Sequence, residues 1–183
     1  MALEFRAPWS RSLKRASRLA LALLLGVSAA GVFLMPAPLP ALRAFLIALP
    51  LLVLLSACLC MVRGYTLTAT TLEVRRPLWR TRYALAGLVS VAGDPAALSG
   101  ALRLFGNGGL FGFSGLFWSK RLGFFHAYAT DPGRAVVLRF AKRTIVITPD
   151  DTQRFIVRVR TQLAAPRPSV GKTRVAPNNC HAA

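Results

Sequence analysis

The sequence predicts a two-part fold, in which an α-helical transmembrane hairpin is followed by a mainly-β domain. Two long uncharged stretches near the N-terminus predict the hairpin. An alternation of apolar and polar residues that begins at Gly64 predicts the strands of the β domain. A helical pattern near the end of the chain predicts a C-terminal helix that plugs a small antiparallel barrel or sandwich.

The hairpin is predicted because Arg43 is the only charged residue between Arg18 and Arg63. Each uncharged stretch is long enough to cross the hydrocarbon core of a bilayer, and the rest of the chain is too small to bury both in a soluble core. The predicted segments are a basic N-terminus (1–18), two transmembrane helices (19–62; about 19–35 and 44–62) joined by a Pro-rich turn, a β domain (64–163) and a disordered basic tail (164–183). A cleaved signal peptide remains an alternative for the first stretch.

Basic residues flank the two predicted helices unequally, and this asymmetry predicts their orientation. Five basic residues precede the first helix and five follow the second, whereas the turn contains only Arg43. They are Arg6, Arg11, Lys14, Arg15 and Arg18 on one side, and Arg63, Arg75, Arg76, Arg80 and Arg82 on the other. We therefore expect both termini in the cytoplasm and the turn on the outside.

The composition narrows the classes of function. The chain has 24 Lys and Arg against 6 Asp and Glu, and 54% of its residues are hydrophobic. Strong basicity at this hydrophobicity favours an anionic membrane surface as partner. Acid–base catalysis and the binding of hard metal ions usually need carboxylates in pairs or clusters, and this chain has few of them. We therefore expect no enzymatic activity and no cofactor. Cys58 and Cys60 lie two residues apart on a predicted helix and face different sides, which favours packing over metal binding.

The β domain begins with short strands and ends with a helix. Asp131-Pro132-Gly133 is a turn between strands in the clearest hairpin pattern of the chain. Thr148-Pro149-Asp150-Asp151 predicts a helix N-terminus with Thr148 as the capping residue. Phe155, Ile156 and Val159 share one face of that helix and are expected to pack on the sheet.

Two segments carry a resemblance to a known bacterial family. They are LRLFGNGGLFGFSGLFWSKRLGFFHAYATDPGRAVVLR and TIVITPDDTQRFIVRV. Together with the preceding hairpin, the region from Gly64 to Leu163 resembles a bacterial membrane protein with two transmembrane segments and a pleckstrin-homology-like (PH) domain. The resemblance implies a seven-stranded, strongly bent sheet capped by a C-terminal helix, and it implies no enzymatic activity. It also places the chain in the bacterial inner (plasma) membrane as a multi-pass protein.

One candidate binding region is a block of glycines and aromatic residues between 105 and 128. Glycine permits close backbone approach, and aromatic side chains favour membrane interfaces. One interpretation of the block is a loop that contacts lipid headgroups or a protein partner through Phe105, Phe111, Phe113, Phe117, Trp118, Lys120 and Arg121. The alternative is a bulged, twisted hairpin whose aromatic residues fill the barrel.

A second candidate region is a cluster of arginines around a turn at Pro77-Leu78. Arg75, Arg76, Arg80 and Arg82 are candidates for contact with anionic phospholipids. The alternative is a solvated basic face near the membrane, without headgroup specificity.

The sequence therefore predicts a non-enzymatic, membrane-anchored PH-like binding or scaffolding module at the cytoplasmic membrane face. Its expected partners are the lipid bilayer, anionic phospholipids and an unidentified protein, which includes a second copy of the chain. Specific recognition of an anionic lipid is the alternative function. Nucleic-acid binding ranks below both, because the basic residues are spread along the chain without a recognised motif.

Overall fold

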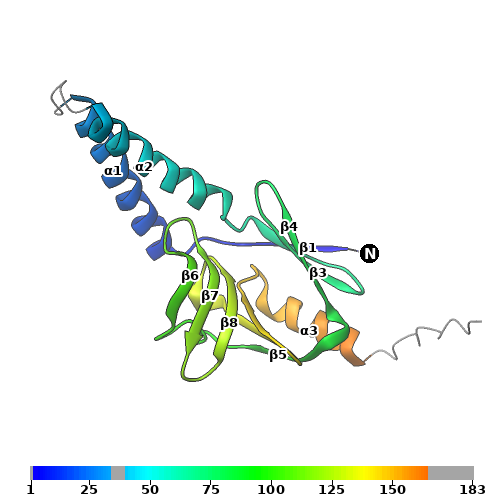
Figure 1. The fold of residues 1–183 in the computed structure, drawn as a ribbon. Helices are drawn as coiled ribbons and strands as arrows, with labels where there is room; N and C mark the ends of the chain where they lie inside the picture. The colour runs from blue at the N-terminus through cyan, green and yellow to red at the C-terminus, as the bar shows by residue number, and fades with distance from the viewer. Residues whose placement is uncertain (1, 34–39, 165–183) are drawn as a thin grey trace, which may run out of the picture.

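Figure 1 shows the computed structural model of the protein, which describes residues 2–33 and 40–164. Two long helices extend together from a β-rich domain, and a third helix lies against that domain. The helices are α1 (Arg11–Phe33), α2 (Pro40–Leu59) and α3 (Thr152–Ala164). Most of the predicted Pro-rich turn and of the predicted tail lies outside the described residues.

The described strands form two sheets. Their bounds are β1 (Leu3–Arg6), β2 (Gly64–Leu67), β3 (Thr71–Arg75), β4 (Arg80–Ala84), β5 (Leu88–Gly93), β6 (Leu102–Gly108), β7 (Phe113–Ser119), β8 (Gly123–Ala129), β9 (Val136–Phe140) and β10 (Thr144–Ile147). The first sheet has the order β1-β2-β3-β4, and the second has the order β5-β9-β10-β8-β7-β6. Every pair is antiparallel except β8 and β10, which run parallel.

The predicted mainly-β domain with a closing helix is confirmed, but its strands belong to a four-stranded and a six-stranded sheet and not to the single seven-stranded sheet that the resemblance implies. The two sheets do not close into a barrel. The turn at Asp131 leads into a short 3-10 helix (Pro132–Arg134) and does not join neighbouring strands, because β10 lies between β8 and β9. The residues of β10 explain its central place: Ile145, Val146 and Ile147 are all fully buried, so both faces of this strand need cover.

Strand β1 is an addition that sequence reasoning does not predict. It lies in the basic N-terminus, ahead of both long helices, and pairs with β2, which follows them. Gly64 allows this pairing, because a Cβ atom there would lie 2.7 Å from the carbonyl oxygen of Phe5. The helical hairpin is therefore an insertion between two adjacent strands of one sheet, as Figure 1 shows.

The two long helices form a hairpin that the β domain leaves largely uncovered. Both are long and apolar enough to cross a membrane. Leu19 and Leu23 of α1 are 72% and 68% exposed, and Leu52 of α2 is 62% exposed. The helices pack on each other, and a hydrogen bond of 3.5 Å joins the Ser28 hydroxyl to the Ile47 carbonyl oxygen. This apolar surface is not that of a helix buried in a soluble core.

Two hydrophobic clusters lie on opposite faces of the second sheet. Alternate residues of one strand supply both, because Ile145 and Ile147 join the larger cluster and Val146 joins the smaller one. The larger cluster lies between the two sheets and α3, and it includes Phe5 of β1. In this cluster burial raises the pKa of Tyr65 to about 12. The prediction that Phe155, Ile156 and Val159 are buried is confirmed.

Helix α3 begins later than the sequence predicts. Asp151 caps it, because the Arg154 N–H donates to the Asp151 carboxylate at 2.9 Å. Thr148 is fully buried instead, and its hydroxyl accepts a hydrogen bond of 2.9 Å from the Thr130 N–H. The predicted cap at Thr148 is therefore wrong, because this hydroxyl bonds the backbone N–H of Thr130, directly after β8, and does not cap the helix.

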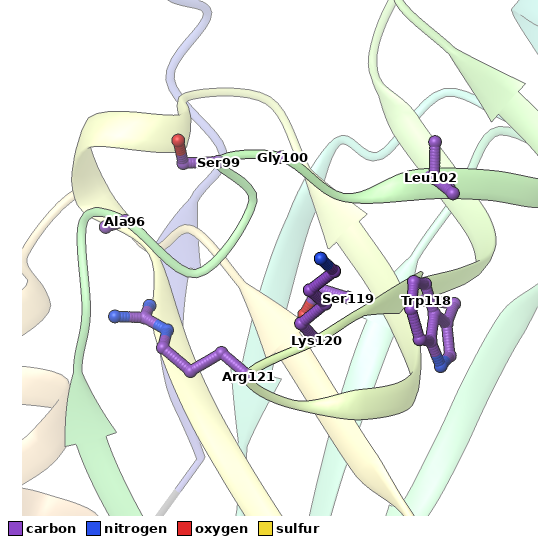
Figure 2. A pocket seen from close by; sticks show the side chains of 8 residues that line it. All are labelled: Ala96, Ser99, Gly100, Leu102, Trp118, Ser119, Lys120 and Arg121. Carbon is purple, nitrogen blue, oxygen red and sulfur yellow. The ribbon is translucent and has the colours of Figure 1, made fainter.

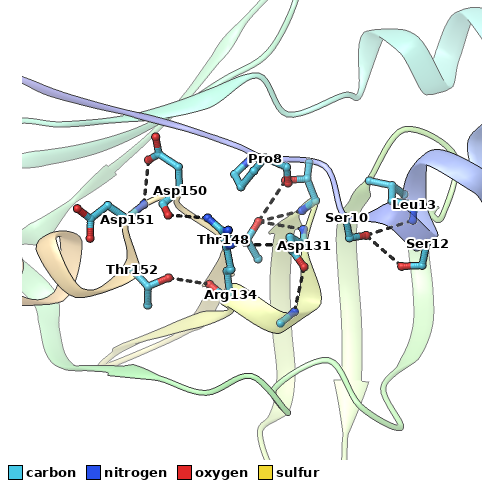
Figure 3. Close-up of polar contacts among 12 residues, drawn as sticks. Pro8, Ser10, Ser12, Leu13, Asp131, Arg134, Thr148, Asp150, Asp151 and Thr152 are labelled. Carbon is cyan, nitrogen blue, oxygen red and sulfur yellow. Dashed lines mark hydrogen bonds and ion pairs between the residues drawn. The ribbon is translucent and has the colours of Figure 1, made fainter.

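The same region holds the N-terminal segment against the domain, as Figure 3 shows. The Asp150 N–H donates to the Arg6 carbonyl oxygen at 3.0 Å, and the Arg6 N–H donates to the Asp150 carboxylate at 3.2 Å. The Thr130 hydroxyl donates to the Pro8 carbonyl oxygen at 2.8 Å. The Ser10 N–H donates to the Thr130 carbonyl oxygen at 3.2 Å, so the chain is fixed to the domain as far as the residue before α1.

Candidate functional site

Three of the four arginines predicted to contact anionic lipids are paired with carboxylates. Arg82 Nε lies 2.7 Å from Glu73 Oε1 on the neighbouring strand, and Arg80 Nη1 lies 3.6 Å from Glu73 Oε2. Arg75 Nη1 lies 2.7 Å from Glu4 Oε1 of β1. These carboxylates offset part of the charge of the β3–β4 hairpin and compete with a phosphate for the same donors.

The fourth arginine, Arg76, connects the two sheets. Its guanidinium carbon lies 5.0 Å from the ring centre of Tyr128 and 5.4 Å from that of Trp79. Its Nη2 donates to the hydroxyl of buried Ser114 at 3.3 Å. Arg76 therefore joins the β3–β4 hairpin to β7 and β8, and the structure does not gather the four arginines into one open cluster.

The glycines of the 105–128 block bring two strands unusually close. Gly106 and Gly115 face each other across β6 and β7, with φ values of +108° and +145°. A Cβ atom at Gly106 would lie 2.3 Å from the Ser114 carbonyl oxygen, and one at Gly115 would lie 2.1 Å from that of Phe105. Only glycine fits both positions, and the pairing is bulged between Arg103 and Phe105.

The aromatic residues of the block divide between core and surface. Phe117 is buried against Phe125, with the two rings stacked and their centres 6.0 Å apart. Phe113 is half-buried and packs on the same cluster. Phe105 lies on the edge strand β6 and is 80% exposed. The block is therefore neither wholly core nor wholly surface, and contact of its exposed residues with lipid or protein stays a prediction.

Figure 2 shows a pocket of about 500 Å³ in the second sheet, beside the C-terminal end of β7. It is lined by Ala96, Ser99, Gly100, Leu102, Trp118, Ser119, Lys120 and Arg121. The pocket therefore brings together three of the predicted interface residues, Trp118, Lys120 and Arg121. Arg121 forms an ion pair with Asp94. The same pocket contains neither Phe105 nor Phe111, so the predicted interface residues do not form one surface.

A second pocket, of about 390 Å³, lies where α1 meets the β6–β7 hairpin. It is lined by Trp9, Lys14, Ser17, Arg18, Leu21 and Phe111, of which the sequence singled out only Phe111 as a binding residue. The rings of Trp9 and Phe111 lie 6.0 Å apart between centres. A signal for this site is present in the sequence, where Trp9 directly precedes a basic segment and an uncharged helix.

Comparison with known proteins assigns the β domain to a protein family. The sequence profile of the family described as Bacterial PH domain matches residues 63–163. The chain belongs to the bacterial PH domain family. The match runs from the residue before β2 into the last turn of α3, so it leaves out β1. No curated protein sequence and no solved structure matches the chain.

PH domains are typically non-enzymatic binding modules for lipids or proteins, and the two apolar helices favour a membrane setting for this one. All six carboxylate side chains of this bacterial PH domain protein have partners within its β domain and β1. Glu4, Glu73, Asp94 and Asp131 form ion pairs, and Asp150 and Asp151 accept backbone N–H groups at the start of α3. Within residues 2–33 and 40–164, the structure shows no cluster of three residues suited to a metal ion.

Proposed function

We propose that this protein is a non-enzymatic binding module that spans the inner membrane twice and holds its PH domain against the cytoplasmic face. The observation that carries the proposal is the pairing of β1 with β2 on either side of the helical hairpin. Because both strands belong to one sheet, both ends of the hairpin emerge on the same side of the membrane. The module therefore carries its binding surfaces at a fixed distance from the bilayer.

The distribution of basic residues supports the cytoplasmic side for the domain. Arg11, Lys14, Arg15 and Arg18 occupy the first two turns of α1, on the domain side of the uncharged run. Only Arg43 lies near the other end of the hairpin, where its Nη2 donates to the Val32 carbonyl oxygen at 3.1 Å. An excess of Lys and Arg marks the cytoplasmic side of membrane helices.

The pairing of β1 also favours retention of the first helix over its removal as a signal peptide. Cleavage after α1 would remove Phe5 from the larger hydrophobic cluster and leave the edge of β2 unpaired. It would also remove Trp9, which packs on Phe111.

Cysteine labelling in intact cells tests this topology. Cys58, Cys60 and Cys180 are first replaced by serine, and single cysteines are then introduced as Ala2→Cys, Ala41→Cys and Lys142→Cys, all at exposed positions. A membrane-impermeant maleimide is expected to label position 41 in intact cells, and positions 2 and 142 only after permeabilisation. Labelling of positions 2 and 142 from opposite sides of the membrane would contradict the placement of both hairpin ends on the same side.

A protein partner is the second candidate, favoured by the exposed edge of the second sheet. Strand β6 forms this edge, and its Leu102, Leu104 and Phe105 are 60%, 51% and 80% exposed. An unpaired edge with apolar side chains is suited to the addition of a strand from another chain. A photocrosslinker at position 105 is expected to yield a discrete adduct in native membranes, and the same probe at exposed Val157 serves as the control.

A further inference from the structure

The pocket between α1 and the β6–β7 hairpin is held by a specific set of contacts. The Ser17 hydroxyl accepts a hydrogen bond of 3.0 Å from the Phe111 N–H and lies 3.5 Å from the Gly109 carbonyl oxygen. Ser17 is 3% exposed, so this junction excludes water. Phe111 has a φ of +61°, an uncommon conformation for a bulky side chain. The contacts to Ser17 and Trp9 keep Phe111 in this conformation, at the wall of the pocket.

The pocket has a basic side without a matching carboxylate. Lys14 and Arg18 line it, are exposed, and lie four residues apart on one face of α1. Arg18 Nε donates to the Lys14 carbonyl oxygen at 3.2 Å, which leaves both Nη groups for a ligand. The six carboxylates of the chain are all engaged elsewhere in the fold, and the described ion pairs include neither Lys14 nor Arg18.

The pocket lies at the level where the headgroups of a bilayer would meet the hydrocarbon core. The uncharged run of α1 starts directly after Arg18, and Leu21 lies about one turn further along the helix. The basic side chains therefore face the headgroup layer, and Leu21 faces the acyl chains. Trp9 suits this position, because tryptophan favours the interface of a membrane.

We propose that this pocket binds one anionic phospholipid, with its phosphate between Lys14 and Arg18 and an acyl chain along Leu21. The indole of Trp9 and the ring of Phe111 cover the glycerol region. Two unpaired cations favour a lipid with net negative charge over a zwitterionic one, whose ammonium group they repel. This inference rests on the proposed membrane-spanning function and names the ligand of that module.

Native mass spectrometry of the full chain in mild detergent tests the proposal. Phosphatidylglycerol and phosphatidylcholine are titrated against the wild type and the Lys14→Gln/Arg18→Gln variant. The Arg154→Gln/Arg158→Gln variant is the matched control, because it removes two exposed cations at the same spacing from α3. We expect one phosphatidylglycerol per chain, bound about 30-fold more weakly after loss of Lys14 and Arg18 and unchanged in the control. The charge-preserving Lys14→Arg/Arg18→Lys variant is expected to restore binding.

Several results would overturn the proposal. Equal losses in the test and control variants would indicate generic electrostatic attraction, and equal binding of both lipids would exclude recognition of the charge. Displacement by glycerol phosphate at equal concentration would indicate a site for free phosphate and not for a lipid. The labelling of positions 2, 41 and 142 is repeated in the Lys14→Gln/Arg18→Gln background. A normal labelling pattern with unchanged binding of phosphatidylglycerol would contradict the lipid site and leave the membrane topology intact, so the two proposals fail separately.

Discussion

Replacement of Phe5 by aspartate is expected to unfold most of the PH domain, although Phe5 lies far outside the matched residues 63–163. The Phe5 ring is 5% exposed and meets the ring of Phe155 edge to face, with 5.2 Å between centres. A carboxylate in this position has to be buried without a partner or forced out together with β1. Either outcome costs several kcal/mol, a large part of the about 5–15 kcal/mol that stabilises a typical domain. The measurement is thermal unfolding of the full chain in detergent, followed by intrinsic fluorescence.

The same substitution at an exposed phenylalanine provides the control. Phe105 is 80% exposed, so the Phe105→Asp variant is expected to change the free energy of unfolding by no more than about 0.5 kcal/mol. If the Phe5 and Phe105 variants unfold at the same temperature, β1 is not part of the folded domain. The assay requires the full chain, because a fragment that begins at Gly64 lacks β1 and leaves Phe155 without its aromatic partner.

Ile156→Asp is expected to have a similarly large effect from the opposite end of the chain. Ile156 is 6% exposed and belongs to the larger hydrophobic cluster between the sheets and α3. Its Cδ1 atom would lie only 3.3 Å from a Cβ atom built at Gly93, so α3 packs closely on β5. We expect a loss of about 4 kcal/mol in the free energy of unfolding, with α3 detached from the sheet. Protease sensitivity of α3 in the full chain reports this detachment.

Val157→Asp isolates the effect of burial from that of helix propensity. Val157 directly follows Ile156 on α3 but is 61% exposed, so the same side chain is introduced with its carboxylate in water. This variant is expected to keep the protease resistance and melting temperature of the wild type. Equal sensitivity of the two variants would mean that α3 is not docked through the face that carries Ile156.

The sequence is sufficient to predict most elements of the β domain, but not β1. Strands β9 and β10 are predictable because each contains a short apolar run, and the segment 141–143 between them is a turn. Strand β1 has only four residues, LEFR, and its partner β2 follows two long helices. Local periodicity therefore contains little information on this pairing, because the contact depends on residues distant in the chain.

The candidate site shows the same division between local and distant information. The basic and aromatic residue types that favour an anionic surface are evident from the sequence. Their partners are not: the pairing of Arg75 with Glu4 depends on the β1–β2 register. The pocket at α1 joins Trp9 to Phe111, and only the folded β6–β7 hairpin brings Phe111 to the helix. The prediction of lipid contact through Arg75, Arg76, Arg80 and Arg82 stays a prediction, with less open positive charge than the sequence indicates.

The order of the strands has a consequence for biogenesis. A ribosome synthesises β1 before α1 and α2, and β2 only after them. The first sheet therefore cannot be completed until both helices have left the ribosome. In the topology proposed above, a chain that inserts only one of the two helices would leave β1 and β2 on opposite sides of the membrane, with Phe5 absent from the core and the edge of β2 open. In the proposed topology, completion of the first sheet therefore depends on the insertion of both helices.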